Sequence, residues 1–399
     1  MNLFSVRYFQ QLLVARTISN VGNGISPVAL AFGTLSIESS GPRELSLVLL
    51  ARTVPIMVML LIGGAFADRF GRAKIMAITD TTLGLLIVLI GFAFIQGQAT
   101  IPLLVLVSLL SGVLNGFWYP AFTGLLPQIV PENQLQRANV IVSFFSNLAF
   151  MLGAALSGLS VTLLGYGATL IIDGITFFTA GLLLTFLVKT DSQRNREQAF
   201  SMIRDIKLGW GEFFSRKWLV LTIGASAVVH FGFEATYAVL GVLASKDFYS
   251  SETSWAAILT SLAAGMLLGS LVADRIAFRR RGVVALAALV LVPIFLIVLS
   301  AASQIWFVLF AALVAGIGYE TYFVIWATTL QRNIPEAMLS RIMSFDGLAV
   351  FTFGPLGIGL AGVLALTFGL SNTLMGMALT GLFAIGLGLT FKTVRQNFN

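Results

Sequence analysis

Long runs of mostly apolar residues are the feature of this sequence that most restricts its fold. Residues 45–66 and 75–94 form two such runs. A helix needs about 20 apolar residues to cross the hydrocarbon core of a bilayer, because each residue adds about 1.5 Å along the axis. Outer-membrane barrels also face lipid, but their strands are shorter segments of alternating polarity. The runs therefore predict an all-α polytopic membrane protein.

The composition agrees with a surface covered by lipid. Hydrophobic residues make up 57% of the chain and charged residues only 10%, whereas a soluble domain carries roughly 25% charged residues. Glycine is abundant, with 39 residues, and small residues let membrane helices approach one another closely. The sequence contains no cysteine, which excludes disulfides, thiol chemistry and iron–sulfur ligation.

Polar breaks divide the apolar runs into twelve expected transmembrane helices. They are expected at 8–36, 44–67, 73–95, 100–126, 137–162, 167–188, 217–243, 252–273, 282–300, 303–330, 341–368 and 371–392. The longest polar break predicts three regions: an N-terminal six-helix bundle (1–188), a cytoplasmic linker (189–216) and a C-terminal six-helix bundle (217–399). An amphipathic patch at 200–214 predicts that the linker contains a helix lying on the membrane surface.

Lysine and arginine concentrate on one side of the expected membrane. If the N-terminus is inside, the outer breaks contain only Arg43 and Lys246. Cytoplasmic loops carry the excess of basic residues, so both termini are expected in the cytoplasm of a multi-pass protein in the cell (inner) membrane. The net charge of +7 then faces the anionic inner leaflet and requires no nucleic acid. The first helix carries Arg16, Asn20 and Asn23, which a cleaved signal peptide would not.

The two halves of the chain share three landmarks in register. The matching pairs are 63–69 with 269–275, 130–132 with 334–336, and 153–154 with 354–355. A parallel two-half repeat, with its binding site at the interface of the halves near the middle of the membrane, is a transporter architecture.

The segment after the second helix carries the most specific motif. Residues 64–74 read Gly-Ala-Phe-Ala-Asp-Arg-Phe-Gly-Arg-Ala-Lys and resemble the signature loop of the major facilitator superfamily. Gly64 and Gly71 permit a tight reversal. Asp68 can accept from backbone N–H groups, while Arg69 and Arg72 can pair with acids across the two halves. An ordinary cytoplasmic turn, which carries Lys and Arg only because cytoplasmic loops are rich in them, would explain the basic residues but neither Asp68 nor the glycines.

Further residues resemble the bacterial drug:proton antiporter group, which includes macrolide efflux proteins and enterobactin exporters. They are Asp80 and the segments 118–121, 126–127, 130–132 and 172–173. The resemblance covers essentially the whole chain and implies efflux of amphipathic small molecules driven by protons, by a monomer without a cofactor. Two positions depart from the antiporter pattern. Ser108 stands where many drug antiporters have arginine, and residues 153–154 lack the proline of the glycine-proline motif.

In this superfamily helices one, four, seven and ten line the central cavity, and these helices carry polar and aromatic side chains at helical spacing. The residues expected in the substrate cavity are Asn20, Asn23, Asn115, Tyr119, His230, Glu234, Tyr319, Glu320, Phe323 and Trp326. An aromatic wall with a few polar groups suits large amphipathic ligands. The aromatic residues of helix ten are equally consistent with ordinary packing, and Ser108 and Ser111 are expected to bond to a neighbouring helix.

Carboxyl groups at membrane depth are the candidates for proton coupling. Burial disfavours the charged form of a carboxyl, which brings proton exchange within reach of physiological pH. Glu234 and Glu320 lie on cavity helices and are the first candidates, and Asp173 is the third. Arg52 is expected to pair with Asp173 in a structural ion pair. His230 is the only histidine, so a zinc site built from histidines is impossible. It lies one turn from Glu234 and is expected to contact it.

Two further acids are expected near the cytoplasmic ends of helices. The arginines of the signature loop could reach Asp80 and Asp346, which we interpret as elements of a gate.

A different carrier, a membrane-embedded enzyme and a channel are the alternative functions. A siderophore, lipid or nutrient carrier on the same fold is the main alternative, because a fold does not fix a function. An enzyme embedded in the membrane is improbable, since the sequence has no His-Glu-x-x-His motif and no clustered nucleophile and base. A channel is disfavoured because no segment resembles a re-entrant filter.

Overall fold

The computed structural model describes residues 7–38, 40–131, 134–188, 214–275, 281–301, 304–334 and 336–392. Throughout this part of the chain the regular structure is helical, with no β-strand. The side chains of some helical residues, among them Asp68 and Asp346, lie outside the described set. The expected linker falls almost wholly outside the described residues, so its surface helix and the expected domain boundaries stay predictions.

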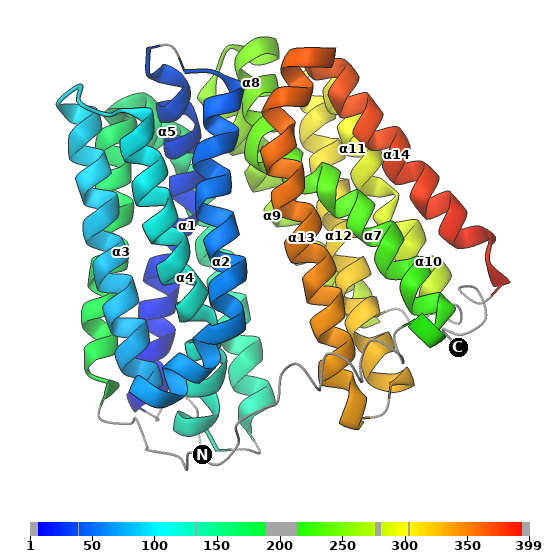
Figure 1. The fold of residues 1–399 in the computed structure, drawn as a ribbon, viewed down its shortest axis with the longest axis horizontal. Helices are drawn as coiled ribbons and strands as arrows, with labels where there is room; N and C mark the ends of the chain where they lie inside the picture. Colours follow the sequence, from blue (N-terminus) through cyan, green and yellow to red (C-terminus); the bar gives the residue numbers. More distant parts are fainter. Residues whose placement is uncertain are drawn as a thin grey trace. The chain divides into compact units, whose positions relative to one another are not determined.

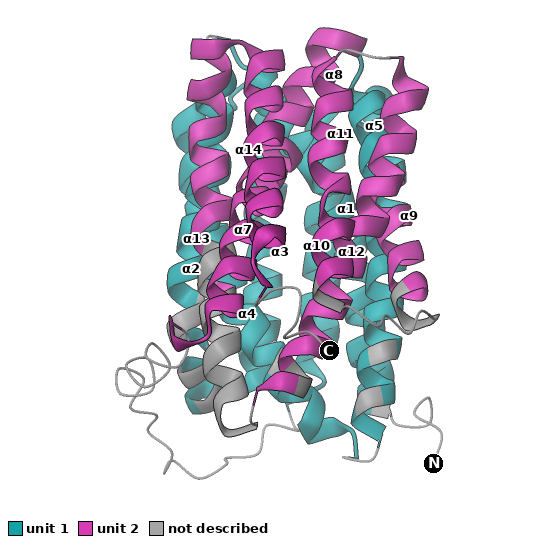
Figure 2. Ribbon diagram, turned by 90° about the vertical axis from the view of Figure 1, so that its right-hand side faces the viewer, with its two compact units in different colours: residues 1–195, 251–260 teal, residues 196–250, 261–399 magenta. Residues whose placement is uncertain are grey.

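The helices form two compact units, which Figure 2 shows in different colours. Unit 1 comprises residues 1–195 together with 251–260, and unit 2 comprises residues 196–250 together with 261–399. The first turns of one helix, α9, therefore pack with unit 1, where the Tyr166 hydroxyl donates a hydrogen bond of 3.0 Å to Oε1 of Glu252.

The helices of unit 1 follow one another through short connections (Figure 1). They are α1 (Arg7–Ser36), α2 (Pro42–Phe70), α3 (Arg72–Ile95), α4 (Ile101–Ile129) and α5 (Leu135–Thr185). The long α5 covers the expected helices five and six, which are separated by Gly165 with φ 79° and ψ 171°. Glycine adopts this backbone conformation at little cost because it has no Cβ.

Unit 2 has more helical segments than expected helices. They are α7 (Lys217–Ala235), the π-helical turn η4 (Thr236–Leu240), α8 (Gly241–Tyr249), α9 (Glu252–Arg275), α10 (Arg281–Leu289), α11 (Leu291–Ser300), α12 (Ile305–Asn333), α13 (Glu336–Phe368) and α14 (Leu370–Thr390). The expected seventh helix is thus divided by a π-helical turn, and the ninth helix is divided at Val290.

Each of the twelve ranges expected from the apolar runs falls on helix in the described part of the chain. Eight helices of that part are long and apolar enough to cross a membrane by length and composition. The longest of them, Arg137–Thr185, has 49 residues, which at about 1.5 Å each is enough for two crossings with Gly165 between them.

Glycines allow close approach of α1 and α5 in unit 1, and of α7 and α13 in unit 2. In unit 1 a Cβ on Gly24 of α1 would lie 2.9 Å from the Cα of Gly153 of α5. In unit 2 a Cβ on Gly354 of α13 would lie 3.2 Å from Cγ of Glu234 of α7. The expected equivalence of Gly153 and Gly354 is therefore matched by their packing, since each one lies against the first helix of its own unit.

Candidate functional site

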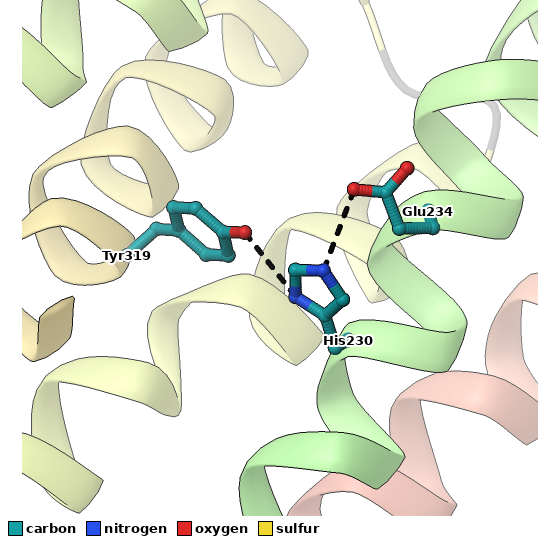
Figure 3. A network of polar contacts seen from close by, with 3 residues as sticks. All are labelled: His230, Glu234 and Tyr319. Carbon is teal, nitrogen blue, oxygen red and sulfur yellow. Dashed lines mark hydrogen bonds and ion pairs between the residues drawn. The ribbon is translucent and has the colours of Figure 1, made fainter. Parts of the chain in front are cut away.

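A chain of polar contacts joins α7 and α12 inside unit 2. The hydroxyl of Tyr319 lies 3.2 Å from Nδ1 of His230, and Nε2 of His230 lies 3.5 Å from Oε1 of Glu234 (Figure 3). His230 and Glu234 are one turn apart on α7, so their side chains lie on one face. A neutral imidazole protonated on Nε2 can accept from the Tyr319 hydroxyl and donate to the carboxylate at the same time. The contact expected between His230 and Glu234 is present.

Aromatic rings surround this chain of contacts. The rings of Phe233 and Tyr319 are stacked with centroids 4.5 Å apart, and the ring of Tyr319 also lies 4.9 Å from that of Phe323. Tyr322 and Trp326 stack at 6.2 Å one turn further along α12. A small pocket opens beside them, lined by Ser226, Val229, His230, Leu289, Tyr319, Tyr322, Phe323 and Trp326. Four of the residues expected in the cavity are thus brought together in unit 2: His230, Tyr319, Phe323 and Trp326.

Glu320 lies apart from this pocket. A Cβ on Gly269 of α9 would be 3.0 Å from the Cβ of Glu320, so the glutamate side chain starts on the face of α12 that packs against α9. Successive residues of a helix point about 100° apart, so Tyr319 and Glu320 do not share a direction. The aromatic residues that flank Glu320 in sequence therefore line a pocket that the carboxyl does not enter.

The helix changes its geometry immediately after Glu234. The α-helical part of α7 ends at Ala235, and the π-helical turn Thr236–Leu240 follows. Single π-helical turns inside α-helices are rare and frequently mark functional sites. Gly354 faces Glu234 from α13 and leaves room for its side chain. The sequence analysis missed this relation, although the glycine-proline pair at 354–355 was a signal that could have directed attention to it.

Unit 1 contains a second polar pocket, here called the Asp173 pocket. It is lined by Asn23, Ser26, Leu30, Arg52, Leu83, Ile87, Ile90, Ser108, Ser111, Leu170, Asp173 and Phe177. The side chain of Asp173 is fully buried, and Arg52 is close enough to act on it electrostatically. Arg52 and Asp173 therefore line the same pocket, together with Asn23 of α1. The ion pair expected between Arg52 and Asp173 stays a prediction.

Three other residues expected in the cavity have different surroundings. The side-chain amides of Asn20 and Asn115 donate to carbonyl groups of their own helices, to Arg16 at 2.8 Å and to Ser111 at 2.9 Å. Tyr119 is 58% exposed. The asparagine contacts are the local side-chain to backbone bonds that polar residues commonly make within a helix.

The half-buried Arg16 and the buried Asp80 lie near each other in unit 1. The guanidinium of Arg16 lies 4.3 Å from the ring centroid of Trp118 and 5.6 Å from that of Phe122. Asp80 is only 3% exposed and interacts electrostatically with Arg16. The structure thus gives Asp80 a neighbour, Arg16, that was not foreseen, and its expected role with the arginines of the signature loop stays a prediction. The aromatic residues of helix four at 118 and 122 were the signal for this arrangement, which the sequence analysis did not use.

The signature loop makes its described contacts within unit 1. Gly71 joins α2 to α3 with φ 97°, a value that glycine adopts readily, which agrees with the tight reversal expected at this residue, whereas Gly64 lies inside α2 and not in the turn. Arg72 donates a hydrogen bond to the backbone carbonyl of Gly124 on α4. The guanidinium of Arg69 lies 5.4 Å from the ring of Phe70. The side chains of Asp68 and Asp346 lie outside the described residues, so a bridge between them stays a prediction.

Metal-based chemistry has no evident site in the described part of the chain. Among those residues, no group of three or more histidine, cysteine, aspartate or glutamate side chains could hold a metal ion. Buried ionisable groups on long apolar helices instead define a polytopic membrane transporter.

Comparison with known proteins identifies the family. The sequence profile of the Major Facilitator Superfamily matches residues 12–358, so the chain belongs to that superfamily and is a transporter rather than an enzyme. It is 26% identical over 384 residues to the multidrug efflux pump Tap of Mycolicibacterium fortuitum, covering 92% of this chain and 91% of that protein. It is 20% identical over 372 residues to macrolide efflux protein A of Streptococcus pyogenes, covering 91% of each chain.

Solved structures show the same fold. The nucleoside transporter NupG superposes with a TM-score of 0.73 over 98% of this chain and 99% of its own, at 16% identity. At this level of identity the likeness concerns the fold and not the substrate.

Proposed function

We propose that this protein exports amphipathic small molecules across the cell membrane in exchange for protons, acting as a monomer with both termini in the cytoplasm. The direction of transport is supported by the similarity to Tap and to macrolide efflux protein A. The orientation is supported by the excess of lysine and arginine in the expected inner breaks.

The observation that carries the proposal is the contact chain from Tyr319 through His230 to Glu234. A carboxylate is costly to bury in an apolar region, so a proton on Glu234 stabilises the buried state. His230 lies close enough to take up or return that proton, and Tyr319 holds the imidazole in place. We therefore assign the coupling proton first to Glu234, with Glu320, on the face of α12 that packs against α9, as the alternative.

The same pocket favours a particular class of substrate. The faces of Tyr319, Phe323 and Trp326 offer apolar area, and the electron-rich faces of aromatic rings attract cations. Lipophilic cations and bulky amphipathic drugs fit this chemistry best. Asn20, Asn23, Asn115 and Tyr119 of unit 1 remain proposed contributors to the substrate cavity.

The direct test uses inverted membrane vesicles and ethidium, an amphipathic cation, as the probe. The proposal expects ethidium to accumulate in energised vesicles and to leave when a protonophore collapses the gradient. Accumulation that persists with the protonophore would exclude proton coupling, and an absence of accumulation with ethidium and with erythromycin alike would exclude drug export.

The Glu234→Gln variant locates the coupling proton. It removes the exchangeable proton and keeps the size of the side chain, so probe binding should remain while gradient-driven transport is lost. Glu44→Gln is the matched control, because Glu44 accepts a hydrogen bond of 2.8 Å from the Gly41 N–H at the start of α2, outside the pocket. Full transport by Glu234→Gln would transfer the assignment to Glu320.

A further inference from the structure

Asp173 is the least satisfied buried acid of the described part of unit 1. Its side chain is fully buried, and among the described residues neither carboxyl oxygen has a hydrogen-bond partner. A buried carboxylate normally accepts several hydrogen bonds or contacts an opposite charge, because removing it from water is costly. A carboxyl in this condition needs a bound cation, ordered water or a proton.

The Asp173 pocket supplies surroundings that suit water and a proton. It has about 30 Å³ in which the centre of a water-sized sphere fits, which is room for about two water molecules. Asn23 and Ser26 of α1 and Ser108 and Ser111 of α4 add polar groups, and a buried water needs two to four such partners.

The charges that face Asp173 are few. Arg52 of α2 is the charged side chain that shares the pocket with it, while α3 contributes only Leu83, Ile87 and Ile90. Asp80 precedes these three residues on α3 and interacts with Arg16. Because Arg52 already supplies a positive charge, a metal cation in the pocket would meet repulsion, whereas a proton binds to the carboxyl itself.

We infer that the Asp173 pocket is a second proton-exchange site, in unit 1, in addition to the site at Glu234 in unit 2. This inference rests on the proposed proton coupling and adds a stoichiometry of two protons for each substrate molecule. The carboxylate of Asp173 takes a proton from water in the pocket, and the neutral carboxyl no longer attracts Arg52. Loss of the proton to water restores that attraction between α2 and α5.

The helix that lies on the carboxyl can respond to its proton. A Cβ on Gly22 of α1 would collide with Oδ1 of Asp173 and with Oγ1 of Thr176, so α1 contacts this part of α5 directly. The same stretch of α1 carries Asn23 and Ser26, which line the pocket. A change in the charge of Asp173 therefore acts on α1, α2 and α5 together.

Infrared spectroscopy of the purified protein tests the site without any substrate. Titration from acidic to alkaline pH should show a protonated-carboxyl band that wild type has and Asp173→Asn lacks, while Asp173→Glu retains a band. Thr169→Val is the matched control, because Thr169 lies one turn before Asp173 on α5 and carries no ionisable group. A band that is unchanged in Asp173→Asn, or that disappears with sodium ions at constant pH, overturns the inference.

Proton counting separates this inference from the proposed function. On binding ethidium, wild type should release about two protons, each of Asp173→Asn and Glu234→Gln about one, and the double variant none. Release of one proton by wild type and by Asp173→Asn alike overturns the second site but leaves the proposed function intact. If wild type releases none, proton coupling itself fails, and the infrared titration still decides whether Asp173 exchanges a proton.

Discussion

The hydroxyl of Tyr319 on α12 lies 3.2 Å from Nδ1 of His230 on α7, which links two helices that are 89 residues apart in the chain. The bond fixes one nitrogen of the imidazole, so the other nitrogen is directed to Glu234 at 3.5 Å. A tyrosine that does not itself carry the exchanged proton can therefore control where that proton goes.

Tyr319→Phe tests this positioning role. The variant keeps the stacked ring but removes the hydroxyl, and the net contribution of one hydrogen bond is about 1 kcal/mol, or roughly fivefold in an equilibrium. We expect gradient-driven ethidium transport to slow by about that factor and its pH profile to shift, while probe affinity changes little. Tyr319→Leu, which also removes the ring, should lower the affinity as well. Equal affinity and equal pH profiles in wild type and both variants would contradict the role.

Gly354→Ala tests the contact between α13 and Glu234. The new Cβ would lie 3.2 Å from Cγ of Glu234, so that side chain must shift by a few tenths of an ångström, whereas its distance of 3.8 Å from Cδ2 of His230 is an ordinary contact. We expect slower proton-driven transport with unchanged expression and thermal stability within a few degrees. Gly386→Ala on α14 is the control, because nothing lies within 4 Å of its Cβ position. Transport equal to that of the control would show that the spacing at Gly354 is not functional.

The apolar runs predicted the positions of the helices because the bilayer thickness fixes the length of a spanning segment. The neighbourhood of His230 and Glu234 was also predictable, since residues four apart share a helix face. The tertiary partners were not predictable from spacing. Nothing in the local pattern indicates that Tyr319 reaches His230.

The direction in which Glu320 leaves α12 could not be predicted from its neighbours in sequence. The sequence places it among Tyr319, Tyr322 and Phe323, but neighbours in sequence on a helix point in different directions. The side chain of Glu320 starts against α9 at Gly269, while Tyr319 and Phe323 line the pocket. Which face of a helix meets which neighbour depends on packing, and one sequence does not determine it.

Gly165→Ala tests the backbone between the two halves of α5. With φ 79° and ψ 171°, a residue with a Cβ is strained by about 1–3 kcal/mol. No atom lies within 4 Å of the Cβ position, so the expected loss of thermal stability comes from backbone strain and not from a clash. Gly224→Ala on α7 is the matched control, because its Cβ position is equally open and its backbone is helical, so stability should be equal or higher. Equal melting temperatures for the two variants would refute this explanation.

Arg16→Met tests the interaction of Arg16 with Asp80. Asp80 is buried, so removing Arg16 takes away a positive charge that acts on a carboxyl withdrawn from water, and this destabilises the fold. We expect a large loss of thermal stability in Arg16→Met and partial recovery in Arg16→Met combined with Asp80→Asn. Arg16→Lys should fall between them, because it keeps the charge but loses the flat contact with Trp118 at 4.3 Å. A double variant no more stable than Arg16→Met would show that the two charges do not depend on each other.

The π-helical turn Thr236–Leu240 has a consequence for the face that the rest of its helix presents. A π-helical hydrogen bond joins residues i and i+5, so such a turn takes up one residue more than an α-helical turn. Because the turn absorbs this extra residue, each residue beyond it points about 100° away from the direction that its number would give in an uninterrupted α-helix. The side chains of α8 therefore lie on a different face of the helix from the one predicted by counting 3.6 residues per turn from His230. Deleting a single residue between 236 and 240 would let an α-helical turn form there, and Gly241–Tyr249 would keep the face that it presents now.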